Sequence, residues 1–148
     1  MYNKNSNSYH FQEVVKTLKY SRQRECIKSF LIGRKDHPTA DTVYMHVRQQ
    51  YPNISLGTVY RNLTLLSDIG EIARLNVGDG VDRFDADTSP HQHIVCSTCG
   101  CVQDIFLPDT EKIIDFASNY YNGVITAQIL HFRGTCSDCM KNPAEQNN

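Results

Sequence analysis

Apolar residues in the first 70 positions recur at the spacing of buried helix faces. Phe11, Val14, Val15 and Leu18 repeat at i, i+3, i+4 and i+7. Three further stripes of this kind follow, each behind a Ser or Thr that can cap a helix. They are Cys26, Ile27, Phe30 and Leu31 behind Ser21; Ala40, Val43, Tyr44, Val47 and Tyr51 behind Thr39; and Leu56, Val59, Leu63 and Leu66 behind Ser55, with Gly70 as a stop signal.

The hydrophobic period changes after Gly70. Residues 72–77 and 81–84 have strand-like composition and flank Gly78-Asp79-Gly80, which is a favourable hairpin turn. Helices followed by a small hairpin predict a winged helix-turn-helix domain over residues 1–84. The segment DADTSP, residues 85–90, is then the expected hinge.

A second domain with both strands and a helix is expected beyond the hinge. Residues 91–96, 102–107 and 124–132 are predicted as strands, and residues 108–121 as a helix with Gly123 past its end. These elements predict a C-terminal α/β domain over residues 91–140, followed by a polar tail over residues 141–148. The fold class predicted for the whole chain is therefore α/β (α+β).

The charge distribution separates the two halves of the chain. Residues 1–75 contain eleven Lys and Arg against six Asp and Glu, and residues 76–148 contain four against ten. The basic half suits a polyanionic partner, and the acidic half suits cations or a protein partner. No run of 18 apolar residues is present, and the first ten residues lack the apolar core of a signal peptide. We therefore expect a cytoplasmic protein without membrane contact.

Four of the six cysteines form two C-x2-C pairs, Cys96/Cys99 and Cys136/Cys139, separated by 36 residues. Two such turns can supply a tetrahedral four-thiolate zinc shell, provided the intervening segment returns to the first pair. A thioredoxin-type redox pair would explain one C-x2-C motif but not two. A closed shell leaves no open position, so this Zn2+ is expected to be structural. Cys101 is interpreted as a free thiol and Cys26 as a core residue.

Histidines and carboxylates suggest a second metal site. His91 and His93 share one face of a predicted strand because side chains alternate along a strand. Asp104 lies on the following strand, Asp85 at the hinge and His37 in the loop before the third predicted helix. Imidazoles combined with carboxylates suit Fe2+, Mn2+ or Zn2+ better than Ca2+. Each residue taken singly is also compatible with an ordinary surface or helix-flanking position.

Three stretches of the chain, residues 37–72, 83–105 and 134–139, resemble the Fur family of metal-dependent repressors, and most closely its peroxide-sensing PerR branch. The similarity extends from about Val14 to Cys139. It implies a winged-helix DNA-binding domain, an α/β dimerisation domain, a homodimer and a double-stranded palindromic DNA operator. It also places structural Zn2+ on Cys96, Cys99, Cys136 and Cys139, and a regulatory Fe2+ or Mn2+ on His37, Asp85, His91, His93 and Asp104.

The resemblance also implies how such a protein responds. One regulatory ion would tie both domains together and so set the spacing of two recognition helices in a dimer. Asp104 is typical of the peroxide-sensing branch, whereas iron-uptake regulators usually have Glu there. In that branch, iron-dependent oxidation of His37 or His91 to 2-oxo-histidine releases the repressor from DNA. The expected function is therefore a peroxide-sensing transcriptional repressor and not an enzyme.

The resemblance implies that the recognition segment is TVYRNL, residues 58–63. With Val59, Leu63 and Leu66 facing inward, Arg61 lies on the outer side of the helix and Tyr60 on its flank, where they can contact phosphate, guanine or a thymine methyl group. Lys19 matches a family position associated with the minor groove. The residues assigned to DNA binding are Lys19, Ser55, Gly57, Thr58, Tyr60, Arg61 and Asn62.

Three alternatives stay open at this point. The first is an iron- or zinc-uptake repressor of the same family that responds to metal occupancy alone. The second is a non-haem iron enzyme or metal hydrolase, which needs open coordination positions and a substrate pocket. The third is a zinc-stabilised interaction module without DNA contact.

Overall fold

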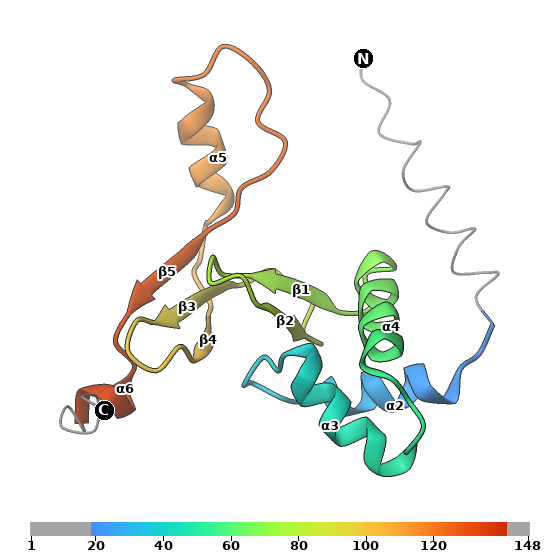
Figure 1. Cartoon of the computed structure of the whole chain (residues 1–148). Coiled ribbons are helices and arrows are strands. Elements are labelled where there is room, and N and C mark those ends of the chain that lie inside the picture. Colours follow the sequence, from blue (N-terminus) through green and yellow to red (C-terminus); the bar gives the residue numbers. More distant parts are fainter. Residues whose placement is uncertain (1–18, 142–148) are drawn as a thin grey trace. The chain divides into compact units, whose positions relative to one another are not determined.

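A computed structural model describes residues 19–141 of the chain. The elements in order are α2 (Arg22–Leu31), α3 (Ala40–Gln50), α4 (Leu56–Asp68), β1 (Ala73–Asn76), β2 (Asp82–Asp85), β3 (Gln92–Cys96), β4 (Val102–Ile105), α5 (Glu111–Ser118), β5 (His131–Gly134) and α6 (Ser137–Lys141) (Figure 1). The chain divides between Thr88 and Ser89 into two compact units. The helix predicted around Phe11 to Leu18 lies outside the described residues.

The N-terminal unit is a winged helix. Its helices begin at the predicted capping residues, Ser21, Thr39 and Ser55. The side chain of each accepts a hydrogen bond from the backbone N–H three residues later, at Arg24, Thr42 and Thr58 respectively. Beyond α4 the chain turns at Gly70, whose φ of 69° favours glycine. Strands β1 and β2 then form the antiparallel wing, with Asn76 opposite Asp82 and Arg74 opposite Phe84.

The core of this unit lies between the three helices and the wing. The fully buried side chains include Ile27, Val43, Val59, Leu63 and Phe84. They come from every helix and from β2, so the predicted stripes meet in one cluster. Leu56 was predicted to belong to the inner stripe, and this is wrong: its side chain is 39% exposed. Leu56 is the first residue of α4, and the buried part of the stripe begins one turn later, at Val59.

The C-terminal unit contains a three-stranded sheet in the order β4-β3-β5. Strand β3 pairs antiparallel with β4 and in parallel with β5. The parallel partner can only be reached by a crossover, which contains α5. Buried Val95 and Val102 lie opposite each other in the β3–β4 pair and give the sheet its small apolar centre.

The last predicted strand is largely wrong. Only residues 131–134 form β5, whereas residues 124–130 have no helix or strand assignment. Val124 and Ile129 are 81% and 85% exposed. β5 pairs with β3 from His93 onward, and β3 begins at Gln92, so residues upstream of His131 have no strand of this unit to pair with. A polar and apolar alternation alone does not form a strand without a partner.

The fold class predicted from the sequence is confirmed: a winged helix is followed by an α/β unit. Two smaller differences concern the C-terminal unit. The helix predicted over residues 108–121 is confined to Glu111–Ser118, and the short helix α6 was not predicted. None of the helices within residues 19–141 is long and apolar enough to cross a membrane.

Candidate metal centres and recognition helix

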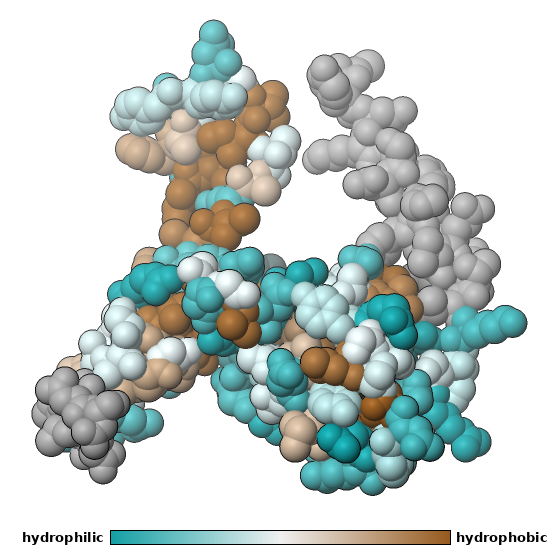
Figure 2. All heavy atoms as spheres, in the orientation of Figure 1, coloured by the Kyte–Doolittle hydropathy of each residue, from teal (hydrophilic) through white to brown (hydrophobic). Residues whose placement is uncertain are grey.

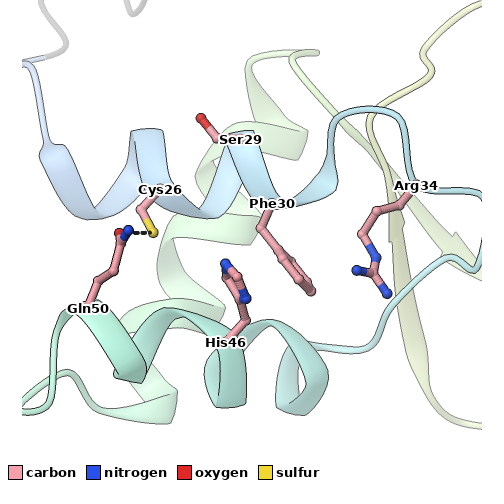
Figure 3. A pocket seen from close by; sticks show the side chains of 6 residues that line it. All are labelled: Cys26, Ser29, Phe30, Arg34, His46 and Gln50. Atoms are coloured by element: carbon pink, nitrogen blue, oxygen red, sulfur yellow. Dashed lines mark hydrogen bonds between the residues drawn. The ribbon is translucent and has the colours of Figure 1, made fainter.

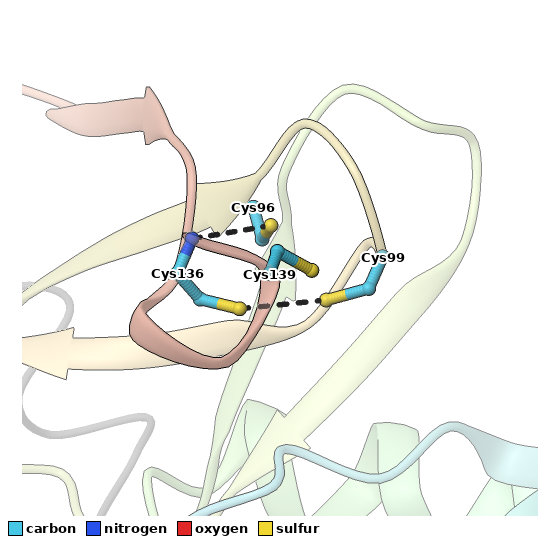
Figure 4. Close-up of side chains that lie close together, drawn as sticks. All are labelled: Cys96, Cys99, Cys136 and Cys139. Carbon is cyan, nitrogen blue, oxygen red and sulfur yellow. Dashed lines mark hydrogen bonds between the residues drawn. The ribbon is translucent and has the colours of Figure 1, made fainter. Parts of the chain in front are cut away.

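The two C-x2-C pairs come together in the C-terminal unit. Cys96 ends β3, Cys99 lies in the turn that follows, and Cys136 and Cys139 lie at the start of α6 (Figure 4). A hydrogen bond from the Ser97 backbone N–H to the Gly134 carbonyl, 2.7 Å long, ties the first turn to β5. The parallel pairing of β3 and β5 therefore delivers both pairs to the same end of the sheet.

The four sulfur positions fit a tetrahedral zinc site. All four Sγ atoms lie within 4.8 Å of one another, and Cys99 Sγ is 3.8 Å from Cys136 Sγ. Zn–S bonds of about 2.3 Å in a tetrahedron place sulfur atoms about 3.8 Å apart. The observed spacing therefore suits a single ion held by the four cysteines.

The backbone favours thiolates at two of these four positions. The Cys136 backbone N–H points at Cys96 Sγ from 3.3 Å, and together with the Cys99 N–H it lowers the pKa of Cys96 to about 5. The Cys139 N–H likewise lowers the pKa of Cys136. Burial, followed by the neighbouring thiols, raises the pKa of Cys139. Metal binding requires deprotonated sulfur, and hydrogen bonds from backbone N–H groups stabilise the thiolate form.

Cys101 lies beside this cluster but is not among the four converging sulfurs. Burial and hydrogen bonds to Cys99 and Cys136 raise the pKa of Cys101 to about 12. Its carbonyl accepts a 2.9 Å hydrogen bond from the Cys96 backbone N–H. With its sulfur outside the converging set, Cys101 is not a candidate ligand of this site.

Three of the predicted regulatory ligands converge on one face of the C-terminal sheet. His93 lies directly opposite Asp104 in the β3–β4 pair, and His91 immediately precedes β3. The distance between His91 Nε2 and His93 Nε2 is 3.0 Å. Asp104 Oδ1 is 3.5 Å from His91 Nε2 and 3.8 Å from His93 Nε2. Adjacent ligands of a first-row metal lie about 3 Å apart when the metal–nitrogen bonds are about 2.1 Å long, so this triad has metal-ligand spacing.

The other two predicted ligands form a buried pair in the N-terminal unit. His37 Nε2 lies 3.3 Å from Asp85 Oδ2, and the side chains are only 1% and 2% exposed. The Phe84 backbone N–H donates to the Pro38 carbonyl at 3.0 Å, and Thr39 forms an isolated bridge with Arg83. These contacts hold the loop before α3 against β2, which places His37 beside Asp85.

The backbone of His37 has the left-handed φ of 47°. This conformation is uncommon for residues other than Gly, although Asn, Asp and His adopt it more often than the rest, and it costs on the order of 1–3 kcal/mol. It is held by the two contacts of the following residues with β2. Such strain is often found at functional sites.

His131 had no predicted role, yet it lies beside the histidine and carboxylate group. It is the parallel-register partner of His93, and the two ring centroids are 6.3 Å apart. Asp104, His93 and His131 thus form a row across the three strands. Burial, and secondarily His93, lowers the pKa of His131. Only the strand register could have revealed this position, because the two histidines are far apart in the sequence.

The residues assigned to a recognition surface all lie in the N-terminal unit. Lys19 precedes α2, and the other six lie between Ser55 and Asn62, at the start of α4. Several of these side chains serve the helix itself: Ser55 caps it, and Asn62 donates to the Thr58 carbonyl at 2.9 Å. Arg61 donates to Thr58 Oγ1 at 3.1 Å but is exposed, as is Tyr60. Arg61 and Tyr60 are therefore two exposed polar side chains of α4 that are available to a partner.

A groove of about 540 Å³ separates α2 from α3 and is lined by Cys26, Ser29, Phe30, Arg34, His46 and Gln50 (Figure 3). Phe30 is stacked between the His46 ring, at 4.2 Å, and the Arg34 guanidinium, at 4.4 Å. Cys26 donates to Gln50 at 3.0 Å, and burial raises its pKa. Cys26 was predicted to be a core residue; it packs against the core cluster and is partly buried. These lining side chains contact one another, which indicates a role in packing α2 against α3.

The model of the ferric uptake regulator family matches residues 15–132. The peroxide-responsive repressor PerR of Staphylococcus saprophyticus is 37% identical over 117 residues, which are 79% of each chain. The Campylobacter jejuni peroxide stress regulator superposes with a TM-score of 0.65 at 25% identity, covering 94% of this chain and all of that one. The Helicobacter pylori ferric uptake regulator Fur shares the fold, with a TM-score of 0.73 at 24% identity over 90% of each chain.

The resemblance inferred from the residues is thus confirmed by a match over most of the chain. The matched segment includes the winged helix and the α/β unit as far as the start of β5. This protein belongs to the ferric uptake regulator family.

Proposed function

We propose that this protein is a cytoplasmic, metal-dependent transcriptional repressor that senses hydrogen peroxide, and not an enzyme. The observation that carries the proposal is the placement of the ligands. His91, His93 and Asp104 form a triad with metal-ligand spacing in one unit, and His37 and Asp85 form a buried pair in the other. The similarity to PerR proteins over 79% of the chain supports the peroxide-responsive branch.

One regulatory Fe2+ or Mn2+ is held by all five of these residues in the proposed mechanism. The N-terminal domain, residues 1–84, and the C-terminal domain, residues 91–140, are then joined across the hinge of residues 85–90. We call the chain closed when all five ligands meet at one ion, and open otherwise. Shifting the ratio of closed to open chains from 1:99 to 99:1 requires the ion to bind the closed form more tightly by about 5.5 kcal/mol. Ligands contributed by both domains make the closed arrangement the better binder, which is the source of that difference.

Peroxide sensing depends on two imidazoles of this set. Bound Fe2+ would act as a redox catalyst that activates hydrogen peroxide beside its ligands, and the peroxide itself would be the two-electron oxidant of the imidazole. Either His37 or His91 then takes up one oxygen at ring carbon C2 to give 2-oxo-histidine, and water carries away the second peroxide oxygen. The modified ring no longer serves as a ligand, so the domains are released from the DNA-binding arrangement. Mn2+ supports DNA binding without this reaction.

DNA binding is assigned to the N-terminal half of α4 and to Lys19. The side chains of Tyr60 and Arg61 are exposed there, and their chemistry suits thymine methyl groups, guanine edges and phosphates. The net positive charge of residues 1–75 supports a polyanionic partner. The proposed operator is a palindromic duplex, read by two recognition helices of a homodimer.

The homodimer is proposed to form through α5 and the segment that follows it. Exposed apolar side chains gather there, among them Phe116, Tyr120, Val124 and Ile129, each at least 66% exposed (Figure 2). An apolar surface of this kind marks an association site. Residues 124–130, which have no strand partner in their own unit, are proposed to gain one at this interface. Sedimentation of the native protein as a monomer at micromolar concentration would contradict this assignment.

The decisive experiment measures DNA binding in three metal states. Duplexes are first selected from a random-sequence library with the Mn2+-loaded protein. Binding is then followed by fluorescence anisotropy for the Fe2+, Mn2+ and metal-depleted forms, before and after stoichiometric peroxide. We expect the Fe2+ form alone to lose affinity with peroxide, with one added oxygen atom on a peptide containing His37 or His91.

Other outcomes separate the alternatives. An Fe2+ form that keeps its affinity after peroxide identifies a repressor that responds to metal occupancy alone. Oxidation confined to cysteines also contradicts the proposed sensing chemistry. Failure to select any duplex in any metal state contradicts DNA binding and favours an interaction module. His46→Gln is a suitable control, because His46 lies on α3 in the groove and outside the proposed ligand set.

A further inference from the structure

Tyr60 of the recognition helix is bound to the wing by its hydroxyl group. The hydroxyl donates a hydrogen bond to the Asp82 carboxylate on β2 and accepts one from Arg74 Nη2 on β1, 3.0 Å away. Arg74 also forms an ion pair with Asp82. Three elements, α4, β1 and β2, thus meet at one closed network of three side chains.

The ring of Tyr60 is fixed from two further sides. Its edge packs against buried Phe84 in a T-shaped contact, with ring centroids 6.5 Å apart. The Arg74 guanidinium carbon lies 5.7 Å from the ring centroid. Arg74 is the cross-strand partner of Phe84, so both reach the same face of the wing that contacts Tyr60. The orientation of Tyr60 therefore depends on the wing and not on α4 alone.

The only donor of the tyrosine hydroxyl and one of its acceptor lone pairs are used within the protein, on Asp82 and Arg74. The hydroxyl therefore has no hydrogen left to donate to a partner, and the exposed portion of the ring is the larger surface on offer. Hydrogen bonds from Arg74 and Tyr60 lower the pKa of Asp82, which keeps the carboxylate ionised at neutral pH. Asp82 therefore places a negative charge beside the recognition helix, where it repels phosphates unless Arg74 compensates it.

We infer that Asp82 and Arg74 are positioning residues that set the sequence discrimination of the recognition helix. Asp82 holds the Tyr60 ring in the orientation that contacts base edges, and its ion pair withholds the Arg74 guanidinium from the phosphates of any duplex. Arg74 in turn neutralises the Asp82 charge and closes the network. This inference rests on the proposed DNA-binding function and adds two wing residues to the α4 residues assigned there.

The test compares specific and non-specific binding by full-length, Mn2+-loaded variants. Fluorescence anisotropy gives Kd for a library-selected duplex and for a scrambled duplex of equal length, at several salt concentrations. For Asp82→Asn we expect about tenfold lower discrimination between the duplexes, with binding to the scrambled duplex becoming tighter. A merely structural role predicts weaker binding to both duplexes.

A double-mutant cycle tests the link to Tyr60. Tyr60→Phe keeps the ring but removes the hydroxyl, so it should lower discrimination to a similar extent as Asp82→Asn. The double variant should lose no more than either single variant, because both disrupt the same network. Additive losses in discrimination would overturn the inference.

The wing offers a matched control in Asp79→Asn. Asp79 carries the same charge on the same hairpin, but it pairs with Arg83 at 2.7 Å and accepts from the Val81 backbone N–H at 3.1 Å. Asp79→Asn should therefore leave discrimination unchanged. An equal effect of both aspartate variants would assign the result to overall wing charge and refute a positioning role. If the native protein binds no duplex, the proposed function fails instead, and the two failures are distinguishable.

Discussion

His93 and Asp104 are directly opposed cross-strand partners on β3 and β4, and His93 Nε2 lies 3.8 Å from Asp104 Oδ1. Opposed residues of an antiparallel pair point to the same face of the sheet. The strand pairing therefore positions an imidazole and a carboxylate for one cation, and His91 joins them from the start of the strand.

This relationship predicts a selective loss of the regulatory metal. Asp104→Asn should weaken Fe2+ and Mn2+ binding at least about tenfold. The loss of a residue that only supports a ligand already lowers metal affinity by about tenfold or more, and this change alters a proposed direct ligand. Asp104→Glu should retain binding but alter the peroxide response, since the longer side chain changes the position of the oxygen ligand. Metal titration with zinc content measured in parallel checks both results. The neighbouring variant Gln103→Ala should bind metal normally, and zinc loss in Asp104→Asn would contradict the assignment.

The proposed zinc site predicts a sharp difference between two cysteine variants. Cys139→Ser removes one of the four converging sulfurs and should abolish stoichiometric zinc, lowering the melting temperature by at least about 10 °C. Cys101→Ser should retain one zinc per chain, because Cys101 lies outside that set. Elemental analysis and thermal unfolding measure the two effects. Zinc retention in Cys139→Ser, or its loss in Cys101→Ser, would show that the ligand set is wrong.

Two leucines of the predicted α4 stripe, Leu63 and Leu56, should differ in their contribution to stability. Leu63 is fully buried in the helical core, so Leu63→Ala should cost about 2–5 kcal/mol and lower the melting temperature by at least about 8 °C. Leu56 is 39% exposed, and Leu56→Ala should cost about 0.5 kcal/mol. Denaturant unfolding followed by circular dichroism measures both. Equal costs would contradict the burial pattern described for α4.

Arg61 should contribute to DNA binding through its exposed guanidinium. Arg61→Ala is expected to cost about 1–3 kcal/mol of binding free energy if the side chain reads a base. If Arg61 contacts only phosphate, its loss would instead lower the affinity for all duplexes. The slope of the logarithm of the binding constant against the logarithm of the salt concentration would then become shallower by about one. Arg48→Ala is the matched control, because the Arg48 guanidinium lies 5.2 Å from the Tyr44 ring centroid on α3. Unchanged binding by Arg61→Ala would remove it from the recognition surface.

Asp82 should make the N-terminal unit sensitive to acid. Its folded-state pKa is lowered by Arg74 and Tyr60, whereas the unfolded chain has the ordinary value of 3.8. The unfolded state thus binds protons more readily, so this contribution to stability is complete above the ordinary pKa and is lost as the pH falls through the lowered one. The difference in melting temperature between native protein and Asp82→Asn should shrink from about pH 6 to about pH 3. A constant difference over that range would contradict the ionised network.

Local features of the fold were largely predictable. Capping residues and apolar spacing located α2, α3, α4 and the wing because these elements depend on interactions close in the sequence. The strand predicted over residues 124–132 failed for the opposite reason. Its pattern was suitable, but a strand requires a partner, and β3 offers pairing only from His93 onward. Leu56 failed because helical spacing does not show where a buried stripe begins.

The sequence by itself determined the donor chemistry: two C-x2-C pairs for zinc, histidines and aspartates for a borderline metal, and an exposed arginine and tyrosine on a recognition helix. Only the tertiary structure decided which donors meet. The parallel pairing of β3 with β5 brings the two cysteine pairs together and places His131 beside His93. Packing of α4 against the wing places the Tyr60 hydroxyl in hydrogen-bonding contact with Asp82. The physical reason is that strand register and packing between elements are set by contacts between distant residues, which local spacing does not encode.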